Sequence, residues 1–180
     1  MLFLKWFLDH LTESGRAGVI VPNGVLFGSG KADRKVRELL LTSCELQAVI
    51  ALPSGVFKPY SGVGTAIFIF EKGKPTDSVW FYELQADGYS LDDKRAPIEA
   101  DDVPDILARW PEREEGPNSF RVGVEKIREN GWQLMPRLYK PVRLDVVKYA
   151  APTDILKDLI KIEQQIAEQA RTLMGRLSAK

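Results

Sequence analysis

Apolar and polar residues follow two different patterns along the first 84 residues of the chain. Four short, nearly continuous apolar runs are rich in β-branched and aromatic residues, which is typical of buried strands. These runs span residues 17–22, 46–53, 64–73 and 78–84. Apolar residues at helical spacing predict helices within 2–11 and 28–44. This order predicts half of an α/β sheet, in which the short turn at 74–77 returns the last strand antiparallel to the one before it.

The composition changes between residues 85 and 119, where ten acidic residues are interspersed with four prolines. Such a run is typical of a solvated face or a linker, and it predicts a mobile acidic connector with one short helix over 103–110. Apolar and aromatic residues return over 120–150 and predict a segment that packs on the sheet. The expected organisation is a sheet-forming part over 1–84, the connector, the packing segment, and a terminal helix over 151–180.

The terminal helix carries the clearest periodic signal of the chain. Its apolar residues follow one another in steps of four and three, which predicts an a/d seam of more than three heptads and a coiled-coil region. They are Ile155, Leu159, Ile162, Ile166, Ala170, Leu173 and Leu177. A long narrow seam needs another helix to cover it, either the first helix of this chain or a helix of another chain.

Composition and charge restrict the class of protein. The 180 residues, 20.2 kDa in mass, suffice for one ordinary domain and an appendage, and 25 basic against 25 acidic residues give no overall basic footprint for nucleic acid. A single cysteine, Cys44, excludes an internal disulfide and a multi-cysteine metal site, and it favours the reducing cytoplasm. The opening MLFLKWFLDHL carries charges and reads as a helix, not a signal peptide, and no run has membrane-spanning length.

Few motifs in the sequence indicate chemistry. Gly28-Ser29-Gly30-Lys31 lacks the Walker pattern, because Val25 and Ala32 occupy the positions of its first glycine and its hydroxyl. Lys31 beside loop amides at a helix start leaves only a weak phosphate contact as a hypothesis. His10 is the only histidine, and neither a Ser/His/Asp set nor metal-ligand spacing occurs, so the chain shows no complete active site and no metal site.

Several blocks of the sequence carry a resemblance to a known family. GRAGVIVPNGVLFGSG, RELLLTSCELQAVIALPSGVF, SGVGTAIFIFEKG and VWFYEL resemble consecutive blocks of the methyltransferase (M) subunit of type I restriction-modification enzymes, which are N6-adenine DNA methylases. ENGWQLMPRLYKP and the terminal helix resemble the C-terminal region of that family. The resemblance implies the C-terminal half of a Rossmann-like sheet, mixed and with antiparallel last strands, that depends on S-adenosylmethionine (SAM).

Two family motifs do not occur in the sequence. The family binds SAM through a glycine-rich loop and holds the adenine amino group with an Asn-Pro-Pro-aromatic tetrad, and both are expected to precede Met1. The chain is therefore expected to be inactive alone, with no catalytic residue of its own. Its contribution would be to the pocket of the extruded base and to subunit assembly.

The resemblance assigns candidate roles to residues that follow two of the predicted strands. Phe57 occupies the place of an aromatic residue that contacts the flipped adenine, and Tyr60 on the same loop is the alternative. The turn Pro22-Asn23 is implied to border the adenine pocket, and Lys58 is a candidate for DNA-phosphate contact, as is Lys31. Two purely structural alternatives remain open. Phe57 could only fill the end of the core, and Asn23 could be an ordinary turn residue.

The resemblance also implies partners. The seam residues Ile155, Leu159, Ile162, Ile166 and Leu173 would dock the specificity subunit, which reads the DNA sequence, beside a restriction subunit and without membrane contact. An exposed strand edge or the terminal helices predict self-association of this chain. Two alternatives remain: a non-catalytic module that presents a coiled-coil helix, and an adenine or RNA methylase outside type I systems.

Overall fold

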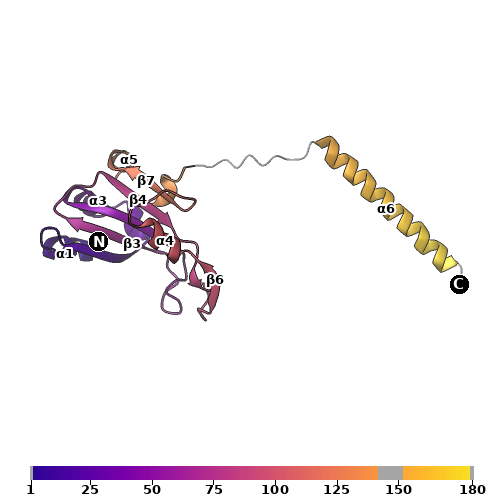
Figure 1. Ribbon diagram of the computed structural model, residues 1–180, viewed down its shortest axis with the longest axis horizontal. Helices are drawn as coiled ribbons and strands as arrows, with labels where there is room; N and C mark the ends of the chain where they lie inside the picture. Colours follow the sequence, from indigo (N-terminus) through magenta and orange to yellow (C-terminus); the bar gives the residue numbers. More distant parts are fainter. Residues whose placement is uncertain (1, 142–151, 179–180) are drawn as a thin grey trace. The chain divides into compact units, whose positions relative to one another are not determined.

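The computed structural model describes residues 2–141 and 152–178, which belong to two compact units (Figure 1). The second unit contains one long helix, α6 (Pro152–Ser178). The helices of the first unit are α1 (Leu2–His10), α2 (Gly24–Phe27), α3 (Lys31–Ser43), α4 (Val103–Arg109), α5 (Val124–Glu129) and the 3-10 helix η1 (Pro136–Leu138). Its strands are β1 (Arg16–Pro22), β2 (Cys44–Leu52), β3 (Thr65–Lys72), β4 (Ser78–Glu83), β5 (Asp87–Tyr89), β6 (Pro97–Asp101) and β7 (Ser119–Gly123).

Five of these strands form a mixed sheet in the order β1-β3-β2-β4-β7. β3 lies between β1 and β2 and runs antiparallel to both, whereas β4 runs parallel to β2 and antiparallel to β7. Each element predicted for the first 84 residues is present, and the 78–84 strand runs antiparallel to the 64–73 strand as predicted. The two strands are not neighbours in the sheet, however, because β2 lies between them. β3 already has a partner on each side, so β4, whose central residues are buried on both faces, pairs beyond β2.

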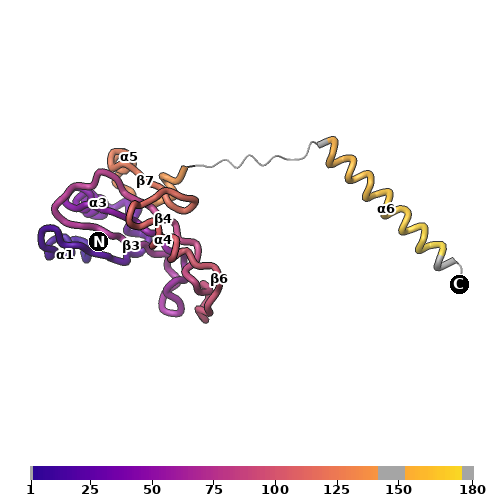
Figure 2. Tube along the Cα trace, viewed as in Figure 1, coloured from indigo at the N-terminus to yellow at the C-terminus, as the bar shows by residue number. Residues whose placement is uncertain are grey.

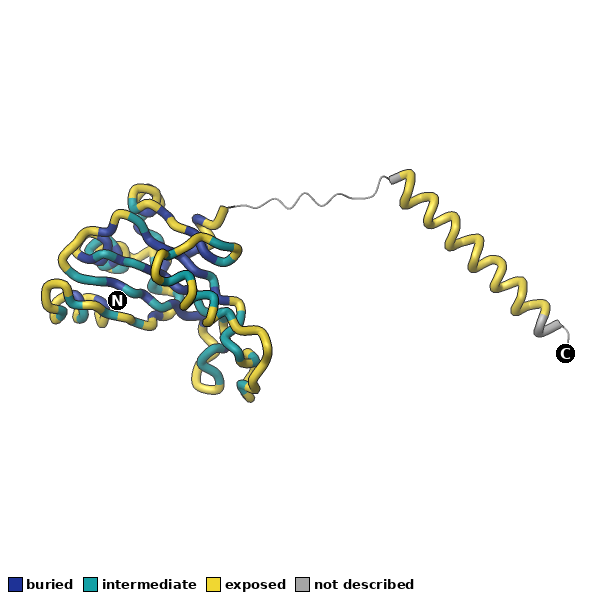
Figure 3. The backbone as a smooth tube through the Cα atoms, viewed as in Figure 1, coloured by how far each residue is buried: buried dark blue, intermediate teal, exposed yellow. Residues whose placement is uncertain are grey.

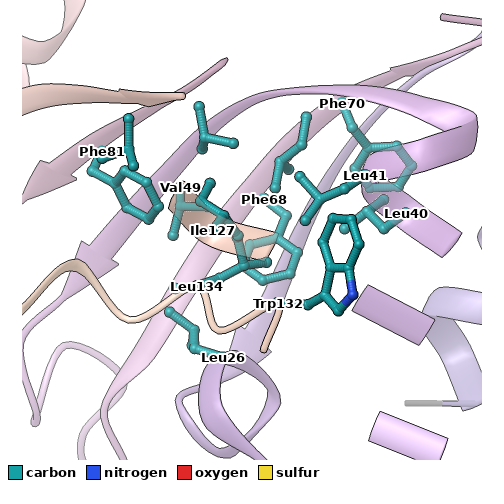
Figure 4. Packing of buried hydrophobic residues seen from close by; sticks show 14 of the residues in the cluster. Leu26, Leu40, Leu41, Val49, Phe68, Phe70, Phe81, Ile127, Trp132 and Leu134 are labelled. Atoms are coloured by element: carbon teal, nitrogen blue, oxygen red, sulfur yellow. The ribbon is translucent and has the colours of Figure 1, made fainter. Parts of the chain in front are cut away.

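One face of the sheet builds the main core (Figure 4). Side chains that alternate along the strands, such as Val49, Phe68 and Phe81, point to this face, as the period of two requires. Helices α1, α3 and α5 cover it with apolar stripes, for example through Leu40 and Ile127. The thiol of Cys44 is buried in the same core, and burial raises its pKa.

The opposite face of the sheet carries a smaller core that α4 covers. Ile106 and Trp110 pack against a cluster that includes Trp80 and Tyr82. The Tyr82 hydroxyl donates to Asp105 Oδ2 (2.9 Å), and burial together with this hydrogen bond raises the pKa of Tyr82 far above its usual value. The predicted short helix in the acidic segment is therefore confirmed as α4.

The acidic segment also contains structure that its composition did not predict. β5 and β6 form a two-stranded antiparallel sheet, and every residue of β6 is exposed. The carboxylates of this segment can stay in water because only a few apolar side chains, such as those of α4, need to reach the sheet. A high acidic content thus did not prevent ordered secondary structure between residues 85 and 119.

Helix α6 confirms the helix predicted for the terminal segment. Every side chain from Thr153 to Gly175 is exposed, including the apolar ones (Figure 3). Within the described residues, no helix combines the length and the apolar character that crossing a membrane would require.

Thr76 stabilises the start of β2 through its hydroxyl, which is buried. The hydroxyl donates to the Cys44 carbonyl (2.7 Å) and accepts from the Leu46 N–H (2.8 Å), next to an irregularity in the pairing of β2 with β3. Thr76→Val removes both hydrogen bonds and leaves these groups without their partner. We expect a loss of about 1–3 kcal/mol in the free energy of unfolding, measured by urea denaturation.

The matched control for this substitution is Thr42→Val, because Thr42 is exposed on α3 and bonds only to carbonyls of its own helix. Its effect should stay within about 0.5 kcal/mol. Equal effects of the two substitutions would show that the Thr76 hydroxyl has no special role.

Candidate nucleic-acid interface

The carboxyl ends of β1, β2 and β4 meet at one edge of the sheet, because these strands run in the same direction. They end at Pro22, Leu52 and Glu83 respectively. Asn23 follows β1, and its backbone N–H donates to the Gly64 carbonyl (3.0 Å), which ties the turn to the start of β3. Open α/β sheets bind ligands outside the carboxyl ends of their strands, so this edge is the candidate site.

A cavity of about 170 Å³ lies at this edge. It is lined by Asn23, Leu26, Ala51, Glu83, Met135, Pro136 and Arg137. The Leu134 N–H donates to the Leu26 carbonyl (2.8 Å), which holds the segment before η1 next to α2. Glu83 also forms an ion pair with Lys140, so the cavity combines apolar walls with charged groups of both signs.

The amide oxygen of the Asn23 side chain lacks a hydrogen-bond partner in the part of the chain that the structure describes. Its Oδ1 is buried and accepts no hydrogen bond from the described residues. A buried acceptor without a donor is costly, so a ligand N–H that reached this oxygen would stabilise it. Gly64 lies beside this side chain, and a Cβ at that position would lie 2.5 Å from Asn23 Nδ2, so a larger residue would displace the Asn23 amide. The arrangement favours a ligand with an amino group.

The aromatic loop, residues 53–64, connects β2 to β3 and begins at the same edge. Phe57 is half-buried, whereas the ring of Tyr60 is 96 % exposed. Figure 2 shows the loop beside the β5–β6 hairpin, and two contacts join them: Lys58 Nζ lies 3.3 Å from Asp93 Oδ1, and Gly55 lies against the Leu91 carbonyl. Gly55 has a φ of +98°, so glycine is favoured there as well.

Both lysines proposed for phosphate contact occur near carboxylates. Lys58 is engaged with Asp93, although this exposed pair is weak and a phosphate could compete for the ammonium group. Lys31 is the first residue of α3, where the Asp33 carboxylate already lies against Gly28; a Cβ built on that glycine would be 2.6 Å from Asp33 Oδ2. A phosphate at this helix start would therefore meet a like charge.

The structure brings together only some of the residues that the sequence singled out. Asn23 lines the cavity and Pro22 precedes it, whereas Phe57 and Tyr60 belong to the adjacent loop and do not line the cavity. The proposed interface residues Ile155, Leu159, Ile162, Ile166 and Leu173 all lie on α6 in the other unit.

Sequence reasoning missed three polar or flexible residues of the cavity, namely Glu83, Met135 and Arg137. Glu83 could have been found, because it closes an apolar strand whose carboxyl end belongs to this edge. The other two come from a segment far along the chain, and only the folding of that segment brings them here.

The described residues offer little other chemistry. Among residues 2–141 and 152–178, no group of three or more His, Cys, Asp or Glu side chains is placed to hold a metal ion. The ring of His10 stacks on Trp6 and its Nδ1 lies 2.8 Å from the Trp6 carbonyl, which is a local helix contact. The edge of the sheet can thus hold and orient a ligand, but its described residues present no nucleophile with an adjacent base.

Solved structures share this fold. A chain from a structure described as showing complex assembly and conformational transition of the type I R-M system matches with a TM-score of 0.69 and 30 % identity, over 99 % of this chain and 39 % of that chain. The methyltransferase subunit of a type I restriction-modification system from Streptococcus thermophilus matches with a TM-score of 0.62 and 28 % identity, over 76 % and 29 % of the two chains. The chain therefore has a mixed α/β fold of the type found in these structures, one of which is a methyltransferase subunit.

Sequence comparison identifies the family. The family described as N-6 DNA Methylase matches residues 1–144. The methylase subunit of the type I restriction enzyme EcoEI from Escherichia coli is 32 % identical over 185 residues, which are 97 % of this chain and 37 % of that relative. The StySJI methylase subunit of Salmonella typhimurium is 30 % identical over 72 % of this chain and 27 % of its own length.

The chain belongs to the N-6 DNA Methylase family, as its sequence blocks predict. It spans little more than a third of the length of the EcoEI subunit.

Proposed function

We propose that this chain acts as the C-terminal segment of a type I M subunit, which transfers a methyl group from SAM to adenine N6 in DNA. Its own contribution is to hold the extruded adenine and to assemble with other subunits. The observation that carries this proposal is a cavity at the carboxyl edge of the sheet, next to a loop with two aromatic residues. Asn23 lines this cavity, and its buried Oδ1 accepts no hydrogen bond from the described residues.

The residues of this edge suit a base that has left the DNA stack. An enzyme that modifies a base within a duplex extrudes it and holds the ring by stacking and by hydrogen bonds to its edge. The adenine amino group is a donor that Asn23 Oδ1 would accept, and Phe57 or Tyr60 would stack on the ring. An acceptor held at the amino group also stabilises the positive charge that develops there during methyl transfer.

The cavity at this edge does not fit SAM. Its volume of about 170 Å³ is smaller than the roughly 300–1,000 Å³ of ordinary ligand pockets, and the glycine-rich loop through which the family binds SAM does not occur in the sequence. SAM supplies the methyl group when bound to the whole enzyme. The residues of this chain would hold the adenine and stabilise the charge at its amino group, whereas SAM would be held by other residues of the whole enzyme.

This chain alone is expected not to bind SAM. Isothermal titration of SAM into the full chain should give no saturable heat, whereas the intact EcoEI methylase subunit under the same conditions should bind it. Saturable binding to this chain would reveal a cofactor site within it and would contradict the proposed division of roles.

Helix α6 is the proposed docking element for the specificity subunit. Its apolar side chains are exposed, and a helix with such a stripe is stabilised by another helix. Recognition of the DNA sequence by a separate subunit also explains why this chain has a formal net charge of zero. The restriction subunit would join through the same assembly.

A non-catalytic interaction module is the second candidate function, and the exposed apolar row of α6 is the observation that favours it. The two candidate functions predict different results for a chimera of the EcoEI methylase subunit. In this chimera, the present chain replaces the matching segment of the EcoEI subunit. The proposed function predicts that the chimera, with its specificity subunit, methylates DNA. An assembled chimera that binds SAM but transfers no methyl group would favour the interaction module.

A further inference from the structure

The apolar row of α6 is exposed along the whole length over which its side chains are described. The exposed fractions are 53 % for Ile155, 51 % for Leu159, 55 % for Ile162, 60 % for Ile166 and 62 % for Leu173. Isolated apolar residues on a surface are common, but a continuous row along a helix of 27 residues is not. Such a row is stabilised by covering it with a second helix.

The spacing of this row differs from the predicted heptads. The steps between residues 155, 159, 162, 166, 170, 173 and 177 are 4, 3, 4, 4, 3 and 4. The steps 4, 3 and 4 thus occur twice, so the pattern repeats after 11 residues. In a heptad pattern, steps of four and three alternate, and the residue after Ile166 would be Gln169 instead of Ala170. An 11-residue repeat has about 3.67 residues per turn, so the row stays nearly straight with a weak right-handed tendency.

The same steps read identically in both directions, so the row is symmetric about Ile166. If a second copy of α6 lies antiparallel with a two-fold axis at Ile166, Leu159 faces Leu173 of the second copy and Ile162 faces Ala170. Ile166 then faces itself. This is the self-complementary arrangement that a two-fold interface requires, in which residue i meets j and j meets i.

Side-chain sizes and flanking residues support the same pairing. Each large Ile162 meets the small Ala170 of the other helix, which lets the two helices approach closely at these layers. Leu156 and Met174, which are 58 % and 68 % exposed, flank the row on one side of the helix. The antiparallel arrangement brings Leu156 of one copy near Met174 of the other, so both become partly covered.

We propose that two copies of this chain associate through α6 in an antiparallel pair centred on Ile166. The inference rests on α6 alone and does not depend on the proposed base pocket. The sequence predicts self-association through either an exposed strand edge or the terminal helices. In the proposed pair, the terminal helix forms the contact, and the exposed edge of β1 does not. A helix of the specificity subunit would use the same row, so its binding would replace the second copy.

Cysteine cross-linking of the full chain tests the pairing. The native Cys44 is fully buried, so the unmodified chain should give little cross-linked dimer under mild oxidation. Ile166→Cys should give a disulfide-linked dimer, because the introduced thiol of each copy faces its own symmetry mate. Leu159→Cys alone should give none, whereas Leu159→Cys mixed with Leu173→Cys should give a linked heterodimer.

Light scattering provides the second measurement. The unmodified chain should be dimeric, Ile166→Asp should be monomeric, and Gln164→Asp on the opposite side of the helix should remain dimeric. A chain that is monomeric at all concentrations would overturn the proposal. So would self-linking of Leu159→Cys, which indicates a parallel pair, or a dimer that survives Ile166→Asp, which indicates association through another surface such as β1.

Discussion

Replacing Arg37 with methionine is expected to lower the free energy of unfolding by about 3–5 kcal/mol. The Arg37 side chain is 1 % exposed and donates three hydrogen bonds to backbone carbonyls. Nε donates to Trp132 (2.8 Å), Nη1 to Val25 (3.0 Å) and Nη2 to Gly28 (2.8 Å). Methionine keeps an aliphatic stem but donates nothing, so three carbonyls lose their partners. Urea denaturation measures the loss.

The consequence of this substitution extends to the candidate site. Val25 and Gly28 belong to α2 and its end, next to the Asn23 turn, and Trp132 lies two residues before Leu134, which bonds to α2. Arg37 therefore holds together two segments that line the cavity. Burial lowers the pKa of its guanidinium while Asp33 opposes this effect, and arginine stays charged at neutral pH in either case.

The control is Arg34→Met on the same helix, because Arg34 is exposed. Its effect should stay within about 0.5 kcal/mol. A loss below about 1 kcal/mol for Arg37→Met would show that water replaces the guanidinium at these carbonyls without much cost.

Phe57→Ala is expected to reduce kcat/KM for DNA methylation about tenfold to hundredfold in the EcoEI chimera described above. The prediction rests on the proposed function, because stacking of a base on an aromatic ring contributes about 1–3 kcal/mol. Phe57 is half-buried, so the residue is not fully enclosed in the core. Methyl transfer to a duplex with one target site measures the effect.

Two further variants separate stacking from packing at this position. Phe57→Leu keeps most of the apolar volume but lacks a flat ring, so it should restore stability without restoring turnover. Full activity of Phe57→Leu would mean that Phe57 only fills the core. If Tyr60→Ala reduces turnover while Phe57→Ala does not, the exposed Tyr60 is the stacking residue.

The sequence predicted the local elements of this protein well, and the physical reason is that they depend on neighbouring residues. Apolar runs of strand length became β1, β2, β3 and β4, and helical spacing became α1, α3 and α6. The short β5 and β6 were missed because acidic residues hide a weak strand pattern. The heptad assignment of α6 was less accurate than the helix assignment, because a single step decides between repeats of 7 and 11 residues.

For the candidate site, the sequence determined only which residues follow each strand. Asn23 and the aromatic loop could be named in advance because they lie in sequence blocks that resemble the methyltransferase family, directly after apolar runs. Tertiary structure decided that β3 separates β1 from β2, that β4 pairs beyond them, and that Glu83 and Arg137 join Asn23 at one cavity. These choices depend on contacts between residues far apart in the chain, where burial of both faces of a strand and the pairing of its edges select one arrangement among many.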